Sequence, residues 1–318
     1  MTKGLPGKRQ MTTSIRYTPH MRGTGSHEET IRRILGRLES AMGPQHWWPA
    51  GSAFEVVVGA YLTQNTAWTN VEQALLNLRR AGALSISGIR CASQEELEQL
   101  VRPAGYFRQK AARLKLFVAH LDANYGGSLD VMFARPKKAL RDELLGLKGI
   151  GPETADSILL YAANHEVFVV DSYTRRIFER HELVSPKTPY EEIRLMVQKA
   201  LGGQGQSGGR QRQQQDQRQD QPQPQGQLPH PSQSQDPGDS EVPRALAVIP
   251  HDPSVASQME RSGLAQRYNE FHALLVQTAK HFCVKGQPKC QDCPLREMLP
   301  SNSKIMPDAR LTRTRGST

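Results

Sequence analysis

The stretch LKGIGPETA, residues 147–155, decides the fold, because it joins two helical segments through a turn that contains two glycines. A helix predicted over 137–145 ends before it, and a second begins at Pro152, whose missing N–H would be unpaired in a first helical turn anyway. Gly149 and Gly151 allow a sharp turn and close approach by another surface. The exposed N–H groups of such a hairpin predict a phosphate-binding site. The alternative is a helix connection that only packs.

The rest of the chain shows helical spacing of apolar residues, and no pair of alternating strands with a turn between them. Residues 54–78 predict two helices with a break near 64–66. The other predicted helices span 29–42, 95–101, 109–125, 152–163, 173–180, 190–200 and 264–279. The chain is therefore predicted to be all-α.

A carboxylate follows the hairpin at a distance of twenty residues, in the segment VVDSYT at 169–174. The apolar residues bring Asp171 to the start of the helix predicted over 173–180, where Asp is a preferred N-cap and often has no other role. Close behind a phosphate-binding hairpin, however, a reaction at a sugar carbon would need negative charge. Asp171 is therefore the candidate catalytic residue, with helix capping as the alternative interpretation.

The composition separates a folded body from three unusual segments. The chain has 318 residues, with 41 Lys and Arg against 31 Asp and Glu and a formal net charge of +10. Residues 1–27 hold five basic groups and no acid, and residues 301–318 hold four and one. Residues 203–245 are almost entirely Gln, Gly, Pro, Ser, Asp and Arg. We expect two basic tails, which suit a polyanion such as nucleic acid, and a disordered Gln-rich insert.

Several classes of protein are excluded by simple features. No apolar run approaches the roughly 20 residues of a membrane-spanning helix, and the N-terminus lacks the apolar stretch of a secretory signal. Four cysteines are too few for a disulfide scaffold. We expect a cytoplasmic monomer without membrane association.

The hairpin and Asp171 together resemble the helix-hairpin-helix, Gly/Pro-rich loop, Asp superfamily of DNA glycosylases, typified by endonuclease III. The resemblance covers about 28–200 and 264–293. It implies duplex DNA with a damaged base as the partner and a catalytic role for Asp171. It also implies DNA contacts through Gly149, Gly151 and, in the gap left by a flipped nucleotide, Gln64.

The resemblance implies two helical lobes with a DNA-binding cleft between them. The glycosylase fold is expected at 28–202 plus 246–300, because the block after the insert is too short to fold alone. Residues 51–165 would form a multi-helix lobe. The second lobe would combine 28–50, 166–202 and 246–300. The alternative is that the insert links two independent domains.

Position 153 departs from the pattern of the bifunctional members. These carry a Lys nucleophile two residues after the second hairpin glycine, where this chain has Glu153. Without that amine no Schiff base forms by this route, so a monofunctional hydrolase is expected. Glu153 itself is interpreted as a cap or ion-pair partner in the first turn of its helix.

Within the superfamily the chain is most similar to 3-methyladenine DNA glycosylase III. Shared features are a Trp-Trp-Pro turn, the stretch LTQNT followed by an aromatic residue, and Glu in place of the lysine. An alkylated purine is cationic and stacks on electron-rich rings, so the candidate base pocket consists of Trp47, Trp48 and Trp68, with core packing as the alternative. Such a base leaves readily, and Asp171 would stabilise the oxocarbenium-like sugar or orient water.

The predicted function is hydrolysis of the N-glycosidic bond of damaged bases, alkylated purines above all, in duplex DNA. One alternative is an endonuclease III-like glycosylase with AP lyase activity on oxidised pyrimidines. Another is a non-catalytic DNA-binding protein.

The last cysteines, Cys283, Cys290 and Cys293, have spacing that continues to a fourth cysteine in endonuclease III-like proteins, where the set binds a 4Fe–4S cluster. Here Leu299 is at the fourth position. Two interpretations stay open. Three cysteines hold the cluster with a non-cysteine ligand, or the segment is the remnant of a lost site.

A second basic candidate lies after the turn Pro103-Ala104-Gly105, where a helix opens with Arg108 and Lys110. Contact with DNA phosphates and a solvated helix start are the two interpretations.

Overall fold

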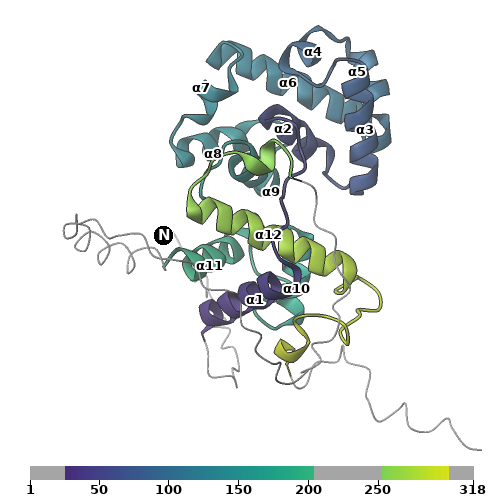
Figure 1. Cartoon of the computed structure of the whole chain (residues 1–318). Helices are drawn as coiled ribbons and strands as arrows, with labels where there is room; N and C mark the ends of the chain where they lie inside the picture. The colour runs from purple at the N-terminus through teal and green to yellow at the C-terminus, as the bar shows by residue number, and fades with distance from the viewer. Residues whose placement is uncertain (1–25, 204–252, 301–318) are drawn as a thin grey trace, which may run out of the picture.

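The computed structural model describes residues 26–203 and 253–300, and the regular structure in this part of the chain is entirely helical (Figure 1). The all-α prediction is thereby confirmed. The α-helices are α1 (His27–Met42), α2 (Ala53–Leu62), α3 (Trp68–Arg80), α4 (Ile86–Cys91), α5 (Gln94–Leu100), α6 (Phe107–Tyr125), α7 (Leu129–Phe133), α8 (Lys137–Gly146), α9 (Pro152–Ser157), α10 (Ser172–Arg180), α11 (Tyr190–Gly202) and α12 (Gly263–His281).

The predicted helices correspond to the longer elements, and the break predicted near 64–66 falls between α2 and α3. The helix predicted over 152–163 is α9 followed by a wider π-helical turn, η2 (Ile158–Ala162), a feature often found at functional sites. The short helices α4 and α7 were not predicted, because six and five residues do not display a helical period.

Most of the segments with unusual composition lie outside the described residues. These are the N-terminal tail as far as residue 25, nearly all of the insert 203–245, residues 246–252 and the tail 301–318. α1 begins at His27, within the tail predicted over 1–27, with Ser26 as its N-cap. No helix in the described ranges is long and apolar enough to cross a lipid bilayer.

The helices fall into two groups, which Figure 1 shows one above the other. The upper group contains α2 to α7, with α8 and α9 at its lower edge, and the lower group contains α1, α10, α11 and α12. In the lower group α1 packs on α11 and α12, and α10 packs on α12. The turn η2 contacts both α2 and α12, so it joins the groups. The lobe limits 51 and 165 stay a prediction.

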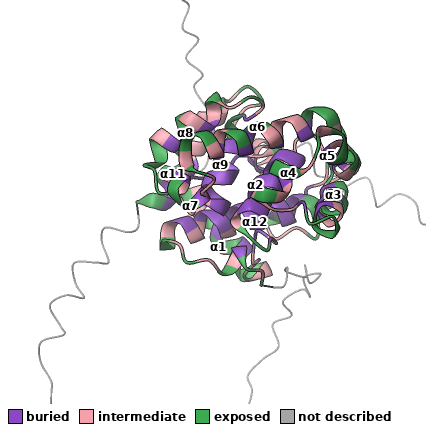
Figure 2. Cartoon of the chain, turned by 90° about the horizontal axis from the view of Figure 1, so that it is seen from above, coloured by how far each residue is buried: buried purple, intermediate pink, exposed green. Residues whose placement is uncertain are grey.

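Burial follows from the sequence pattern of each helix. α1 is amphipathic and buries one face, formed by Ile31, Ile34, Leu35 and Leu38. In α2, by contrast, residues 54–62 are all buried, as expected for a helix that is apolar on every side. Figure 2 shows α2, α9 and α12 as the buried centre of the molecule. The central helices therefore provide a rigid base for the hairpin.

The hairpin between α8 and α9 is fixed by its backbone and by a buried carboxylate. Gly149 has a φ of +88°, and a Cβ there would collide with the Arg113 guanidinium. Asp156 in α9 is fully buried, forms an ion pair with Arg141 of α8 at 2.6 Å and accepts a hydrogen bond from the Tyr190 hydroxyl at 2.8 Å. α8, α9 and α11 are thus locked together directly behind the hairpin.

Candidate functional site

A cleft of about 890 Å³ is lined by residues from both groups of helices. Its walls come from the segments before and after α2, the hairpin and α9, the start of α10, and one face of α12. The cleft brings together seven of the predicted site residues: Trp47, Trp48, Gln64, Trp68, Gly149, Gly151 and Asp171. The other predicted site residues, Arg108, Lys110 and the three cysteines, do not line it.

Asp171 caps α10, as the alternative interpretation predicted, and it also lines the cleft. Its Oδ1 accepts hydrogen bonds from the N–H groups of Tyr173 at 3.0 Å and Thr174 at 2.7 Å. Its Oδ2 lies 3.5 Å from Nε2 of His272 in α12. Burial by itself would raise the pKa of Asp171, but His272 and the bonds from Thr174 outweigh it and hold the pKa below its usual value. Asp171 is therefore a fixed negative charge.

His272 connects this carboxylate to the core. The histidine is 5% exposed, and its Nδ1 lies 2.5 Å from the hydroxyl of Tyr161 in η2. Burial raises the pKa of Tyr161 well above its usual value, so the hydroxyl keeps its proton. The contact with Tyr161 holds the imidazole so that its Nε2 faces Asp171.

Glu153 lies two residues beyond Gly151, and its exposed side chain lines the same cleft. The carboxylate has no hydrogen-bond or ion-pair partner among the described residues, so its interpretation as a cap or ion-pair partner is wrong. It is open to water at the cleft surface, but the surrounding walls desolvate it. This desolvation, together with the charge of Asp171, raises the pKa of Glu153 to about 7.

The three tryptophans form one wall of the cleft. The ring centroids of Trp47 and Trp48 are 5.6 Å apart, and those of Trp48 and Trp68 are 5.3 Å apart. Trp47 and Trp48 are nearly buried, so much of their surface belongs to the core, whereas Trp68 is half-buried. The Lys280 ammonium lies 5.7 Å from the centre of the Trp47 ring, and burial lowers the pKa of Lys280. The wall therefore combines ring faces with a positive charge.

Gln64 ties the end of α2 to the hairpin. Its Nε2 donates to the carbonyl of Gly149 at 2.8 Å and to Oγ1 of Thr154 at 3.0 Å. Its Oε1 accepts a hydrogen bond from Arg113 at 2.8 Å. Gln64 thus lies at the cleft surface with its amide already oriented, and its role in filling the gap of a flipped nucleotide stays a prediction.

The prediction that Lys110 contacts DNA is wrong. Its side chain is 2% exposed, and its ammonium is enclosed by four acceptors at 2.6 to 3.0 Å. The acceptors are the carbonyls of Leu62, Gln64 and Ala104 and the hydroxyl of Thr66. Lys110 therefore holds the segment between α2 and α3 in place, as a buried charge must be fully hydrogen-bonded. Arg108 points to solvent, with a side chain 81% exposed, and remains available to a phosphate.

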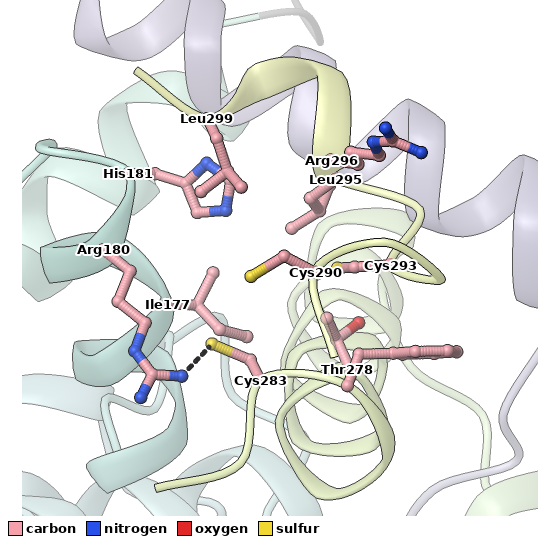
Figure 3. Close-up of a pocket in the computed structure, with 11 residues that line it drawn as sticks. Ile177, Arg180, His181, Thr278, Cys283, Cys290, Cys293, Leu295, Arg296 and Leu299 are labelled. Carbon is pink, nitrogen blue, oxygen red and sulfur yellow. Dashed lines mark hydrogen bonds between the residues drawn. The ribbon is translucent and has the colours of Figure 1, made fainter. Parts of the chain in front are cut away.

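The three cysteines line a second pocket beside α10 and α12 (Figure 3). The Arg180 guanidinium donates a hydrogen bond to Sγ of Cys283 at 3.0 Å, and Leu299 lines the pocket where a fourth cysteine would stand. Burial raises the pKa of Cys293 to about 11. In the part of the chain that is described, no three His, Cys, Asp or Glu side chains are arranged to hold a metal ion. The residues present do not fit a 4Fe–4S cluster, which uses four thiolates, and they favour the remnant interpretation.

The contribution of α12 to the site was not predicted from the sequence. His272, Val276 and Lys280 all line the cleft. Their spacing of four residues places them on one face of α12. The signal available in the sequence was the presence of two basic residues, His272 and Lys280, on the otherwise buried face of α12.

Known proteins with similar sequences are DNA repair proteins. A family model, described as HhH-GPD superfamily base excision DNA repair protein, matches residues 58–202. A protein of Methanocaldococcus jannaschii, provisionally named a DNA repair glycosylase, is 35% identical over 272 residues, 85% of this chain and 95% of that protein. Endonuclease III of Thermotoga maritima is 31% identical over 138 residues, 43% of this chain and 61% of the relative.

Two solved structures are similar over most of the chain. The 3-methyladenine DNA glycosylase of H. pylori, bound to 1,N6-ethenoadenine, has a TM-score of 0.56 and 25% identity, covering 82% of this chain and all of that one. Endonuclease III trapped as a covalent intermediate with DNA has a TM-score of 0.58 and 18% identity, covering 86% of this chain and 95% of that one. The second similarity is one of fold alone.

Proposed function

Because this chain belongs to the HhH-GPD superfamily of base excision DNA repair proteins and is a DNA glycosylase, we propose that it removes alkylated purines from duplex DNA and leaves the strand intact. One observation carries the proposal. A half-buried, ionised Asp171 faces a cleft walled by tryptophans, in which position 153 holds a carboxylate and not an amine.

The alkylated base is argued from the chemistry of the cleft. N-alkylation makes a purine cationic, and a cation is attracted both to the faces of indole rings and to carboxylates. The cleft offers Trp48 and Trp68 together with two carboxylates, whereas the Lys280 ammonium already lies over the Trp47 ring. The similarity to a 3-methyladenine DNA glycosylase with a bound purine derivative supports the same class of base.

The reaction requires a negative charge more than an acid. As the N-glycosidic bond breaks, the deoxyribose becomes an oxocarbenium-like cation, and the fixed charge of Asp171 stabilises it. A cationic purine leaves as a neutral base, so it needs no proton. Hydrolysis then adds water at C1′ and produces an abasic site.

The hairpin would hold the DNA backbone next to this carboxylate. Gly151 is exposed, and no atom lies within 4 Å of the position that a Cβ would occupy. A phosphate can therefore approach the N–H groups at the start of α9 closely. Arg113 and Lys285 line the same cleft and add positive charge.

The test uses purified full-length protein and a panel of duplexes with methylated, oxidised and mismatched bases, each assayed with and without alkali. We expect release of methylated purines, strand breaks only after alkali, and no borohydride-trapped adduct. Asp171→Asn should abolish base release while duplex affinity stays close to that of the wild type.

Three results would contradict the proposal. Base release by Asp171→Asn at the wild-type rate would remove the role of the carboxylate. A trapped adduct would support the bifunctional alternative, with Lys280 or Lys285, the two lysines that line the cleft, as the amine. Binding without base release from any duplex would support the non-catalytic alternative.

A further inference from the structure

Glu153 is the one carboxylate lining the cleft that has no hydrogen-bond or ion-pair partner among the described residues. The hairpin places it in the first turn of α9, on the cleft surface with Asp171 and His272. The exposed side chain is open to water, so its oxygens are available to a molecule in the cleft.

Asp171 is in the opposite situation. Both of its oxygens are engaged, Oδ1 by two backbone N–H groups and Oδ2 by the proximity of His272. Its surroundings stabilise the ionised form, so it has little tendency to accept a proton. Such a carboxylate provides charge, and the proton of the attacking water must go to another group.

When the surroundings of two carboxylates in one site shift their pKa values apart, the two groups commonly have different roles in hydrolysis. Glu153 is desolvated next to the negative Asp171, so its pKa of about 7 lies where a proton acceptor works best at neutral pH. The pKa of Glu153 thus agrees with a role as proton acceptor, which its position in the cleft and its free oxygens also favour.

We propose that Glu153 is the general base that activates water in the glycosylase reaction, an inference that rests on the proposed function. A carboxylate oxygen of Glu153 accepts a proton from water while the water oxygen bonds to C1′. The electron pair of the N-glycosidic bond leaves with the cationic purine, which becomes neutral. Glu153 then returns the proton to solvent.

The groups around Glu153 define the pH dependence. Asp171 raises the pKa of Glu153 and His272 lowers it, and Tyr190 of α11 also interacts with the Glu153 charge. The cations that line the same cleft are Arg113, Lys280 and Lys285. Since the base must be ionised to act, the rate should rise with pH up to about 7 and then level off.

The experiment measures single-turnover base release between pH 5 and 9, on the duplex of the panel that the wild type processes fastest. Glu153→Gln keeps the shape of the side chain but cannot accept a proton. We expect the rate of base release to fall about 100-fold at pH 7.5, and the rise of the rate with pH up to about 7 (the limb near pH 7) to disappear. Exogenous formate should partly restore Glu153→Ala, since a small carboxylate can occupy the vacated space.

The matched control is Glu192→Gln, in the first turn of α11, where the carboxylate is exposed and does not line the cleft. It should retain the wild-type rate and pH profile. A purely structural role for Glu153 would lower the rate without removing the limb and without rescue by formate.

The outcomes separate the two proposals. If the wild type releases base and Glu153→Gln keeps its rate and pH limb, Glu153 is not the base and only this inference fails. If the wild type releases no base from any duplex of the panel, the proposed function fails, and this inference fails with it.

Discussion

Oδ2 of Asp171 lies 3.5 Å from Nε2 of His272, and this contact joins two residues 101 positions apart in the chain. Nδ1 of His272 is held by the Tyr161 hydroxyl at 2.5 Å, so the imidazole cannot turn freely. The histidine therefore keeps the candidate catalytic carboxylate ionised and oriented, in a place where burial alone would favour the neutral acid. His272 acts through Asp171 and is a positioning residue.

Replacement of His272 by Asn should raise the pKa of Asp171, because the ring that stabilises its charge is lost. Base release should slow by about tenfold, because the carboxylate is held less firmly in place. The shift is best measured in the Glu153→Gln background, where the limb near pH 7 is absent. There the rate should fall as Asp171 becomes protonated, and the His272 change should move this acid limb to higher pH. An unmoved limb would show that His272 does not control the carboxylate.

Replacement of Trp68 by Ala should weaken recognition of the damaged base. Trp68 is the half-buried ring of the tryptophan wall, and a base stacked on an aromatic ring gains about 1–3 kcal/mol. We expect kcat/KM to fall about 10- to 100-fold, while Trp68→Phe keeps most of the activity. Affinity for a duplex with an abasic site should not change, since no base remains to stack. Equal losses with both duplexes would mean that Trp68 supports the fold or the backbone contacts instead.

Lys110 and Arg108 lie two residues apart and should have opposite effects. Lys110→Met leaves buried acceptors unpaired, so the free energy of unfolding should fall by roughly 2–4 kcal/mol, as measured by denaturant titration. Arg108→Ala removes an exposed charge and should change stability by less than about 0.5 kcal/mol. It should instead reduce the slope of log affinity for DNA against log salt by about one. A stable Lys110→Met protein would contradict the structural role.

The purified protein should show no broad absorption band of an iron–sulfur cluster near 400 nm, even after reconstitution with iron and sulfide under reducing conditions. The reason is the donor set, in which Leu299 stands in place of the fourth cysteine. Cys290→Ser should then retain the thermal stability and base release of the wild type. Stoichiometric iron, lost in Cys290→Ser, would show that three cysteines suffice.

The amino-acid sequence determined the local features of this protein. The hairpin at 147–155, the order of the long helices and the break after α2 depend on glycine, proline and apolar spacing over a few residues, so they could be predicted directly. The position of Asp171 behind the hairpin and the Glu at 153 were also visible, because both are defined by their distance along the chain from the same two glycines.

Tertiary structure alone decided which side chains meet. His272 and Lys280 come from α12, more than a hundred residues after the hairpin, and reach the cleft because α12 packs against η2 and α10. Lys110 faces inward, where carbonyls of an adjacent segment satisfy its charge. The interpretation of Glu153 was wrong because its position in the first turn of a helix suggests a cap or an ion pair. Whether a partner lies within reach depends on the tertiary structure. Periodicity reports which face of a helix is buried, whereas the charge and pKa of a group depend on its neighbours in space.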